Sequence, residues 1–251
     1  MKRLIIIIPC YNEAAHIKTV LNQIINSFPL HPSINFELFI LDDCSTDNSY
    51  EILQKFKNKY SFIHLMHHKE NKGIVEATKN LISAALKQKP DYLLKCDMDT
   101  DFSHPIILKK FLPYINKHIT NHSFLIGIRK LNENSNCSDF EIVEKNKMNS
   151  YLVNELNIKN YEPISSGVQL YDAFLIQKLL NNQLVIDFNE RWGLDILLPV
   201  LATLLGYSTT QIFIAQGSYQ IERRSKEKIE KQYQIYYRIF KLLEKRKKNR
   251  Y

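Results

Sequence analysis

The chain has 251 residues and a formal net charge of +8, with 45% hydrophobic and 24% charged residues. This composition excludes an intrinsically disordered chain, and the length suits one substantial hydrophobic core. No apolar run reaches the roughly 18 residues that a membrane-spanning helix needs, so we expect a cytoplasmic protein that at most attaches to the inner face of a membrane.

The first hundred residues alternate short apolar runs with helical patterns. The runs expected to form strands are residues 4–8, 36–41, 62–66 and 92–96. The stretches between them carry apolar residues at three- and four-residue spacing, over residues 13–27, 47–59 and 72–87. Strands that alternate with helices in this way are typical of βαβ units. We therefore predict an α/β fold with a mostly parallel central sheet flanked by helices.

Polar residues follow each of the four predicted strands. The four polar segments begin at Pro9, Asp42, His67 and Asp97. In an open parallel sheet the ligand lies outside the carboxyl ends of the strands, so these segments are expected to meet at one edge. Each segment also has a simpler explanation when taken alone. Asn12 or Thr46 can cap a helix, and Asn71 with Gly73 can form a turn.

Three aspartates follow the fourth predicted strand at alternating positions, namely Asp97, Asp99 and Asp101. Their carboxylates repel one another unless a cation lies between them. Mg²⁺ and Mn²⁺ prefer oxygen ligands and leave coordination positions open for substrate phosphates. A solvated turn rich in aspartate is the simpler alternative. The cluster predicts a Mg²⁺ or Mn²⁺ site.

A pair of aspartates, Asp42 and Asp43, follows the second predicted strand. A carboxylate at this edge of the sheet can accept hydrogen bonds from a ribose or from the edge of a base. The pair therefore predicts nucleotide binding. Asp47 lies in the first turn of the next predicted helix, where the helix dipole explains it equally well.

The second half of the chain predicts further elements and ends in a basic helix. We expect helices over residues 105–118, 140–156, 173–180 and 194–205, and strands over residues 124–128 and 211–215. Residues 130–139 lack periodicity and predict a loop. Residues 226–245 combine an apolar stripe with many basic residues, so this amphipathic helix is expected to pack on the domain or on a second copy, with membrane attachment as the alternative.

These elements predict one domain over residues 1–220, followed by the basic helix within residues 221–251. Within the domain, residues 1–100 form the expected nucleotide-binding half. Residues 101–220 form the expected acceptor half.

Four segments together resemble the family-2 glycosyltransferases of the GT-A fold. They read Ile-Pro-Cys-Tyr-Asn-Glu (residues 8–13), Leu-Asp-Asp-Cys-Ser-Thr-Asp (41–47), Asn-Lys-Gly-Ile (71–74) and Asp-Met-Asp (97–99). Weaker matches follow in Gly-Ile-Arg (127–129), Ser-Gly-Val-Gln-Leu (166–170) and Trp-Gly-Leu-Asp (192–195). The resemblance implies a hexosyltransferase with a nucleotide sugar as co-substrate and Mg²⁺ or Mn²⁺ as cofactor.

The resemblance also implies roles for individual residues. Those implied to bind the nucleotide sugar are Pro9, Tyr11, Glu13, Asp43, Lys72, Asp97 and Arg129. An inverting enzyme of this family also needs a general base for the acceptor's proton. Asp195 is the candidate, although the helix dipole alone also favours a carboxylate at a helix start. Trp192, the only tryptophan, is a candidate either to stack on a sugar or to pack in the core.

The sequence departs from the family pattern in two places. Cys44 stands where the family usually has glycine after the paired aspartates. Many enzymes of this fold use a late histidine as third metal ligand, whereas all eight histidines here lie between His16 and His122. The third ligand is then Asp101, Gln220, Glu222, the nucleotide or water.

Several acceptors and two other functions stay open. Residues 224–226 resemble polyprenyl-phosphate sugar transferases, whereas residues 192–195 resemble enzymes that glycosylate small hydroxy acids. The acceptor is therefore expected to be a glycan, a lipid phosphate or a small acid, and the stereochemistry is open. A non-catalytic nucleotide-sugar-binding protein and a nucleotidyltransferase are the alternatives. We expect no nucleic-acid partner, because the predicted edge is acidic where a phosphate backbone would lie. The candidate partners of the basic helix are a membrane surface, through a peripheral contact, and a second copy of the chain, in a homodimer.

Overall fold

A computed structural model describes the chain apart from residues 100–102, 117–122, 131–138, 159–166, 217–225 and 249–251. Its centre is a seven-stranded sheet with the order β3-β2-β1-β4-β6-β5-β7. The strands are β1 (Lys2–Cys10), β2 (Ile34–Asp42), β3 (Ile63–His67), β4 (Tyr92–Lys95), β5 (Ser123–Lys130), β6 (Gln169–Asp172) and β7 (Ser208–Gln216). Among the described pairs, β6 runs antiparallel to β4 and β5, and all others are parallel. The predicted mostly parallel sheet is confirmed.

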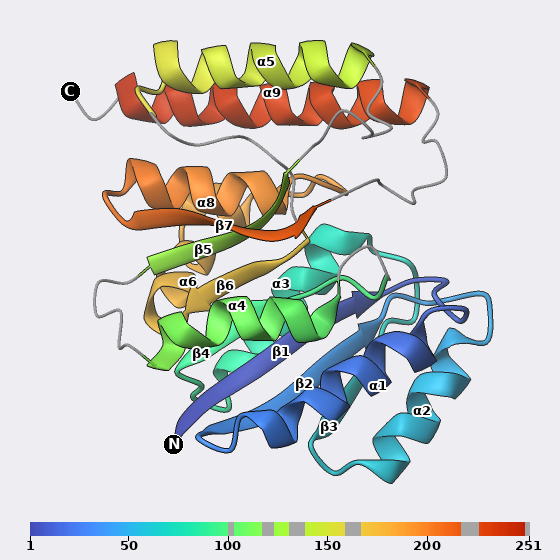
Figure 1. Ribbon diagram of the computed structural model, residues 1–251. Helices are drawn as coiled ribbons and strands as arrows, with labels where there is room; N and C mark the ends of the chain where they lie inside the picture. Colours follow the sequence, from blue (N-terminus) through green and yellow to red (C-terminus); the bar gives the residue numbers. More distant parts are fainter. Residues whose placement is uncertain (100–102, 117–122, 131–138, 159–166, 217–225, 249–251) are drawn as a thin grey trace.

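Helices cover both faces of this sheet (Figure 1). They are α1 (Ile17–Ser27), α2 (Ser49–Lys59), α3 (Ile74–Leu86), α4 (His104–Asn116), α5 (Asp139–Asn154), α6 (Ala173–Leu180), α7 (Gln183–Ile186), α8 (Leu194–Leu204) and α9 (Lys226–Lys248), with a 3₁₀ turn η1 (Phe28–Leu30). Buried residues of α1, α2 and α4 share one core cluster, and those of α3, α6, α8 and α9 share the other. The sheet therefore separates two apolar cores.

The pleat of β1 explains why its apolar run is continuous. Leu4, Ile6 and Ile8 belong to the core beside α1, whereas Ile5 and Ile7 belong to the core beside α3. All five are almost entirely buried. A central strand with helices on both faces needs apolar side chains at successive positions, because successive residues point to opposite faces.

The predicted C-terminal helix forms as α9 and packs against α5 and α8 (Figure 1). Its apolar stripe faces the rest of the chain, because Ile235, Ile239, Phe240 and Leu243 are buried. The approach to α8 is close, since a Cβ added at Gly193 would lie 2.7 Å from the Cδ1 atom of Ile239. Within the described ranges, no helix combines the length and the apolar character that a membrane span requires.

The structure contains three short elements that the sequence pattern did not predict. These are η1, β6 and α7, each of three or four residues and thus shorter than a periodic pattern can reveal. The loop expected over residues 130–139 falls mostly outside the described residues, so the structure does not test it.

Candidate active site

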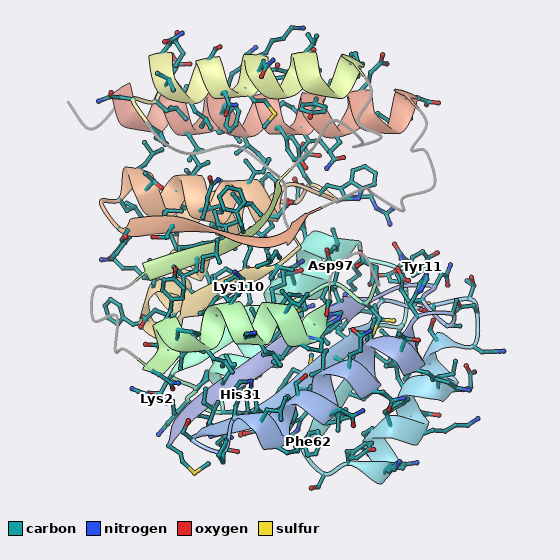
Figure 2. The ribbon with its side chains drawn as sticks, in the orientation of Figure 1. Lys2, Tyr11, His31, Phe62, Asp97 and Lys110 are labelled. Carbon is teal, nitrogen blue, oxygen red and sulfur yellow. The ribbon has the colours of Figure 1, made fainter. Side chains whose placement is uncertain are left out.

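The polar segments predicted to meet at one edge of the sheet do so. Figure 2 shows Asp97 and Tyr11 on one side of the molecule, remote from Lys2 at the start of β1. Strands β1, β2, β3 and β4 are parallel, so the segments that follow them emerge together. This edge is where an open α/β sheet binds its ligand.

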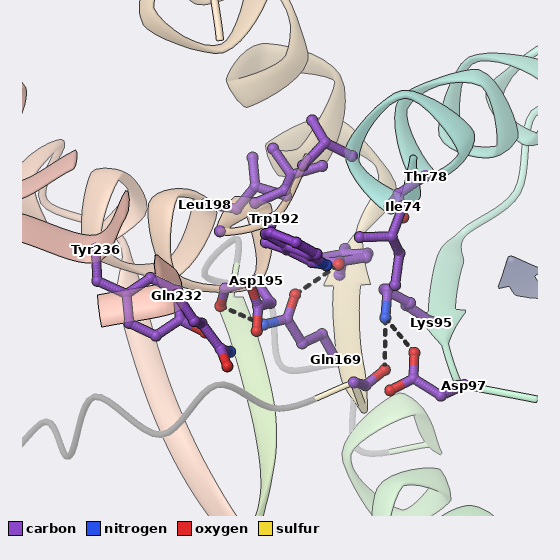
Figure 3. Close-up of a pocket in the computed structure, with 15 residues that line it drawn as sticks. Ile74, Thr78, Lys95, Asp97, Gln169, Trp192, Asp195, Leu198, Gln232 and Tyr236 are labelled. Carbon is purple, nitrogen blue, oxygen red and sulfur yellow. Dashed lines mark hydrogen bonds and ion pairs between the residues drawn. The ribbon is translucent and has the colours of Figure 1, made fainter. Parts of the chain in front are cut away.

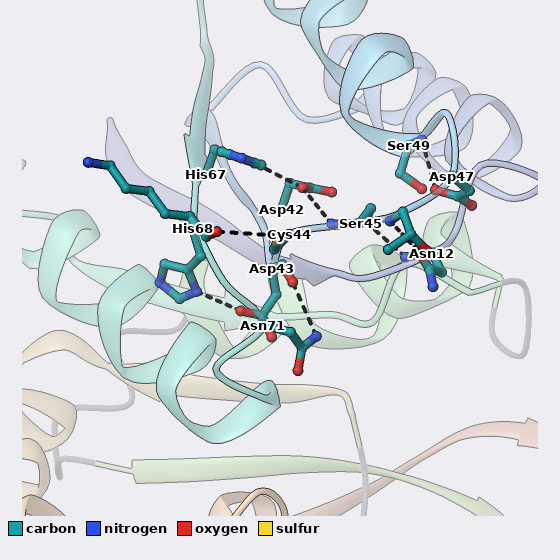
Figure 4. A network of polar contacts seen from close by, with 12 residues as sticks. Asn12, Asp42, Asp43, Cys44, Ser45, Asp47, Ser49, His67, His68 and Asn71 are labelled. Atoms are coloured by element: carbon teal, nitrogen blue, oxygen red, sulfur yellow. Dashed lines mark hydrogen bonds and ion pairs between the residues drawn. The ribbon is translucent and has the colours of Figure 1, made fainter.

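The loops after β1 and β2 are bound to each other (Figure 4). The backbone N–H of Thr46 donates to Asn12 Oδ1 at 2.8 Å, and that of Ala14 donates to Asp47 Oδ2 at 3.1 Å. Asp47 Oδ1 also accepts from Ser49 N at 2.9 Å. Partial burial raises the pKa of Asp47, but the hydrogen bonds from Ser49 and Ala14 outweigh it, so the pKa lies below its usual value. Asn12 and Asp47 therefore fix the shape of this rim.

Asp43 shapes the turn after β3. Its carboxylate is 3% exposed and accepts from Lys72 N at 2.9 Å and from Gly73 N at 2.7 Å. His68 Nδ1 lies 2.6 Å from the same carboxylate. These bonds hold the Asn71 to Gly73 turn in place, and Gly73 occupies a backbone conformation with φ of +87° that suits glycine.

Asp42 also serves the loops. It is fully buried, and its Oδ2 atom lies 3.0 Å from His67 Nδ1 and 3.1 Å from Ser45 N. Asp42 thus has no surface left for a ligand, in contrast to the nucleotide role that the pair suggested.

A buried lysine holds the first aspartate of the acidic cluster. Lys95, at the end of β4, is 4% exposed, and its Nζ atom lies 2.7 Å from Asp97 Oδ1 and 3.1 Å from the carbonyl oxygen of Gly167 (Figure 3). Burial lowers the pKa of Lys95, but the charge of Asp97 and the hydrogen bond to it outweigh burial, and the pKa is raised. Lys95 is therefore a fixed cation.

Gly167 lies directly against the Asp97 carboxylate. A Cβ atom added at Gly167 would stand 1.5 Å from Asp97 Oδ2. No side chain fits in that space, so the observed position of the Asp97 carboxylate requires glycine at position 167. The Ser-Gly-Val-Gln-Leu segment thus contributes to the site by close backbone approach.

Gln169 links β6 to the helix that carries Asp195. It pairs with Lys95 in the antiparallel register of β4 and β6, so both side chains lie on the same face of the sheet. Gln169 is fully buried; its Nε2 atom donates to the carbonyl oxygen of Asp195 at 2.6 Å, and its Oε1 atom accepts from Tyr171 OH at 2.7 Å. The amide thereby fixes the first turn of α8.

Lys95, Asp97 and Asp195 line one cavity of about 120 Å³ (Figure 3). Ile74 and Thr78 of α3 and Trp192 before α8 form further parts of its wall, and α9 contributes Gln232 and Tyr236. The cavity therefore combines charged groups with aliphatic and aromatic walls. Such a combination suits a ring with apolar faces and a polar rim.

The remaining predicted nucleotide contacts lie beside this cavity rather than in it. Pro9 is buried at the end of β1, Tyr11 is 45% exposed, Glu13 is half-buried and Lys72 is exposed. Asp101, Gln220 and Glu222 fall outside the described residues, and Arg129 belongs to β5 but its side chain is not among those described.

Of the three aspartates predicted to bind a metal, Asp97 and Asp99 lie among the described residues. The described part of the chain brings together no group of three or more His, Cys, Asp or Glu side chains suited to a metal. Two carboxylates are sufficient for Mg²⁺ when substrate phosphates and water supply the other ligands. A Mg²⁺ or Mn²⁺ ion at this pair therefore stays a prediction, and Asp97 already has Lys95 as a positive partner.

The sequence patterns missed Lys95, Gln169 and Tyr171 as parts of the site. Lys95 did carry a signal, because a charged residue inside an apolar run is seldom buried unless it has a partner. Gln169 lies in the weaker family match over residues 166–170, but that match does not show its role, and Tyr171 gave no signal. The roles of both residues depend on the position of Asp195 in space.

Comparison with protein families gives one match over most of the chain. The family described as "Glycosyl transferase family 2" matches residues 5–166. Among curated proteins, poly(ribitol-phosphate) beta-N-acetylglucosaminyltransferase TarS of Staphylococcus aureus is 30% identical over 130 residues, which is 51% of this chain and 21% of that protein. Dolichyl-phosphate beta-glucosyltransferase ALG5A of Trichomonas vaginalis is 23% identical over 82% of this chain and 63% of its own length. The chain thus spans about a fifth of the first relative and less than two thirds of the second.

Solved structures share the fold at low sequence identity. Mannosyl-3-phosphoglycerate synthase from Rubrobacter xylanophilus superposes with a TM-score of 0.69 at 13% identity, over 95% of this chain and 73% of that one. S. aureus TarS in complex with UDP-GlcNAc gives 0.59 at 20% identity, over 89% and 60%. A mannosyltransferase from Pyrobaculum calidifontis in complex with GDP-Man and Mn²⁺ gives 0.59 at 16%, over 89% and 58%. These similarities show that the fold is of the GT-A type.

Proposed function

We propose that this chain, which belongs to glycosyl transferase family 2, transfers a hexosyl group from a UDP- or GDP-sugar to an acceptor hydroxyl. One observation carries the proposal. Asp97, Lys95 and Asp195 line a single cavity at the carboxyl edge of the sheet, beside the loops fastened by Asn12 and Asp43. The cavity supports a site for the sugar, and the loops beside it support a site for the nucleotide.

The nucleotide is proposed to bind across the loops that follow β1, β2 and β3. Pro9 lies in β1, and Tyr11 and Glu13 follow that strand. Asp43 follows β2 and binds the backbone of Lys72, which follows β3. The exposed ring of Tyr11 offers a stacking surface for a base. Because the Asp43 carboxylate is already engaged by two backbone N–H groups and by His68, its proposed contact with the base depends on its remaining lone pairs.

The transfer reaction divides its charges between the two ends of the cavity. The acceptor oxygen attacks the anomeric carbon, the bond from that carbon to the phosphate oxygen breaks, and the electron pair passes to the diphosphate. A Mg²⁺ or Mn²⁺ ion at Asp97 and Asp99 would stabilise this negative charge. Lys72 and Arg129 are the proposed cationic side chains for the same charge. Asp195 is proposed to take the proton of the acceptor hydroxyl.

The acceptor is proposed to be a glycan, a polyprenyl phosphate or a small hydroxy acid. Two relatives are named for phosphate-containing acceptors, poly(ribitol phosphate) and dolichyl phosphate. The net charge of +8 also favours an anionic acceptor. A cytoplasmic location, a peripheral membrane contact and a homodimer through α9 stay predictions.

Binding and hydrolysis of UDP- and GDP-sugars, measured with and without Mg²⁺ or Mn²⁺, test the proposal. We expect one donor to bind and to be slowly hydrolysed in the presence of metal, and Asp99→Asn to lose most of this activity. Glu51→Gln, an exposed carboxylate on α2, is the control and should behave as wild type. Binding without any turnover would support the non-catalytic alternative, and no binding under any metal condition would refute both.

A further inference from the structure

We propose that Lys95 recognises the sugar that is transferred, by donating a hydrogen bond from its ammonium group to an oxygen on the ring in the cavity. This inference rests on the proposed function and names a specificity-determining residue for it. Lys95 is an unusual side chain for its place, because the other residues of β4, Tyr92 to Leu94, are buried and apolar or aromatic.

The hydrogen bonds of the ammonium group leave one donor for a ligand. An ammonium has three N–H donors. Two of them are used by the described residues, one by Asp97 Oδ1 at 2.7 Å and one by the Gly167 carbonyl oxygen at 3.1 Å. Lys95 lines the cavity and is 4% exposed, so its small accessible surface faces the cavity. A ligand there can accept the third N–H.

The cavity is too small for a nucleotide and suits part of a single ring. It measures about 120 Å³, which is of the same order as the cavity of about 150 Å³ that holds one benzene molecule. Ile74, Trp192 and Tyr236 can cover the apolar faces of a sugar, and Thr78 and Asp195 can face its hydroxyl groups. The third N–H of Lys95 then selects for an oxygen acceptor, either a hydroxyl group or an acetamido carbonyl, at the end of the ring nearest Asp97.

The alternative is that Lys95 has a purely structural role, which predicts a different effect of its loss on ligand binding. If Lys95 only positioned Asp97, its loss would disturb the diphosphate as much as the sugar. Binding of a nucleoside diphosphate and of its nucleotide sugar would then weaken together. If Lys95 contacts the sugar, only the gain in affinity that the sugar provides is lost.

Calorimetric titration of both ligands against Lys95→Met separates these roles. The probes are the nucleotide sugar selected by the donor screen and the matching nucleoside diphosphate, both with Mn²⁺. We expect the affinity for the nucleotide sugar to fall by about tenfold or more, as for a lost hydrogen bond to a charged group, and the affinity for the nucleoside diphosphate to change by less than about twofold. Lys2→Met is the matched control, since Lys2 also pairs with an aspartate, Asp91 at 3.0 Å, at the opposite end of the sheet.

A parallel loss of affinity for both ligands, or no loss for either, would overturn the proposal. If Lys95→Met does not fold, Lys95→Arg decides the question, because arginine keeps the positive charge but places a larger planar group in the cavity. We expect Lys95→Arg to bind the nucleoside diphosphate and to lose the preference for the nucleotide sugar. If wild type binds neither ligand, the proposed function fails and the role of Lys95 fails with it. If wild type binds both ligands and Lys95→Met binds them with the same affinities, only the role of Lys95 is refuted.

Discussion

Asp97, the first aspartate after β4, lies between Lys95 and Gly167. Lys95 gives Asp97 a positive partner at 2.7 Å, and Gly167 gives it space. A buried ion pair contributes little net stability, because desolvation of the two charges offsets much of their attraction. The pair is therefore better explained by what it does in the cavity than by stability.

Gln169 provides a test of how the proposed base is positioned. We expect Gln169→Leu to lower kcat by roughly tenfold to 100-fold, because a shift of about 1 Å in a reacting group costs on that order. The affinity for the nucleotide sugar should stay within about twofold, since Gln169 fixes Asp195 and not the nucleotide. Steady-state kinetics and donor titration measure the two effects separately.

Tyr171→Phe is the graded companion of this variant. It removes the hydroxyl group that holds the Gln169 amide but leaves the bond from Gln169 to Asp195 intact. We expect a smaller fall in kcat than for Gln169→Leu. An unchanged kcat in Gln169→Leu would show that Asp195 does not depend on this amide.

At the level of elements, α9 is joined to α5 by two tyrosines. Tyr237 OH donates to Glu144 Oε2 at 3.1 Å, and Tyr151 OH donates to Glu244. Burial and the hydrogen bond to Glu144 raise the pKa of Tyr237 to about 12 from its usual 10.0. Each tyrosine must keep its proton to make its bond, so the docking of the two helices depends on pH.

The stabilisation from Tyr237 is present below pH 10 and is lost as the pH rises toward 12, because the folded pKa lies above the unfolded one. We therefore expect wild type to have a larger free energy of unfolding than Tyr237→Phe at pH 8. This difference in unfolding free energy should vanish near pH 12. Urea denaturation from pH 8 to 12 measures it. Glu144→Gln should reduce the same pH dependence, and a constant difference across the range would contradict the assignment.

Most elements were predictable because their information is local. The apolar runs of β1 and β2 and the three- and four-residue spacing in α1 and α3 are properties of short windows. Helix α6 was predicted with its observed bounds of Ala173–Leu180. The short α7 was not predicted, because four residues contain too little pattern to separate a helix from a turn.

At the scale of the whole molecule, α9 connects the stability of the fold to the cavity. Phe240 is fully buried and stacks on Tyr151 with ring centroids 5.5 Å apart, while Tyr236, one turn earlier, lines the cavity. We expect Phe240→Ala to cost about 3–5 kcal/mol of unfolding free energy. For a chain of this size that corresponds to a melting temperature lower by roughly 10 °C.

Leu242→Ala is the matched control on the same helix. Leu242 is 46% exposed, so its truncation should lower the melting temperature by no more than about 2 °C. Differential scanning calorimetry compares the three proteins. Equal losses in the two variants would mean that α9 is not anchored by its buried stripe.

The site was less predictable than the fold, because part of it is formed by β6, which runs antiparallel to its neighbours. The polar segments after β1, β2, β3 and β4 are recognisable in the sequence, because each follows an apolar run that predicts a parallel strand. Strand β6 runs in the opposite direction, so it brings its beginning, at Gln169, to the same edge. Residues that come before a strand therefore contribute to the site, and only the paired register shows that Gln169 lies opposite Lys95.

The position of β6 also bears on the order of folding. Strand β1 pairs with β2 through residues 32 positions apart, such as Lys2 and Ile34. The pairing of β1 with β4 joins Leu4 to Tyr92, 88 positions apart, and the contact between Lys95 and Gly167 joins residues 72 positions apart. Contacts between distant segments form slowly, because a long loop must close first. We therefore expect β1 and β2 to pair before the cavity is complete, because the cavity needs both β4 and β6 in place.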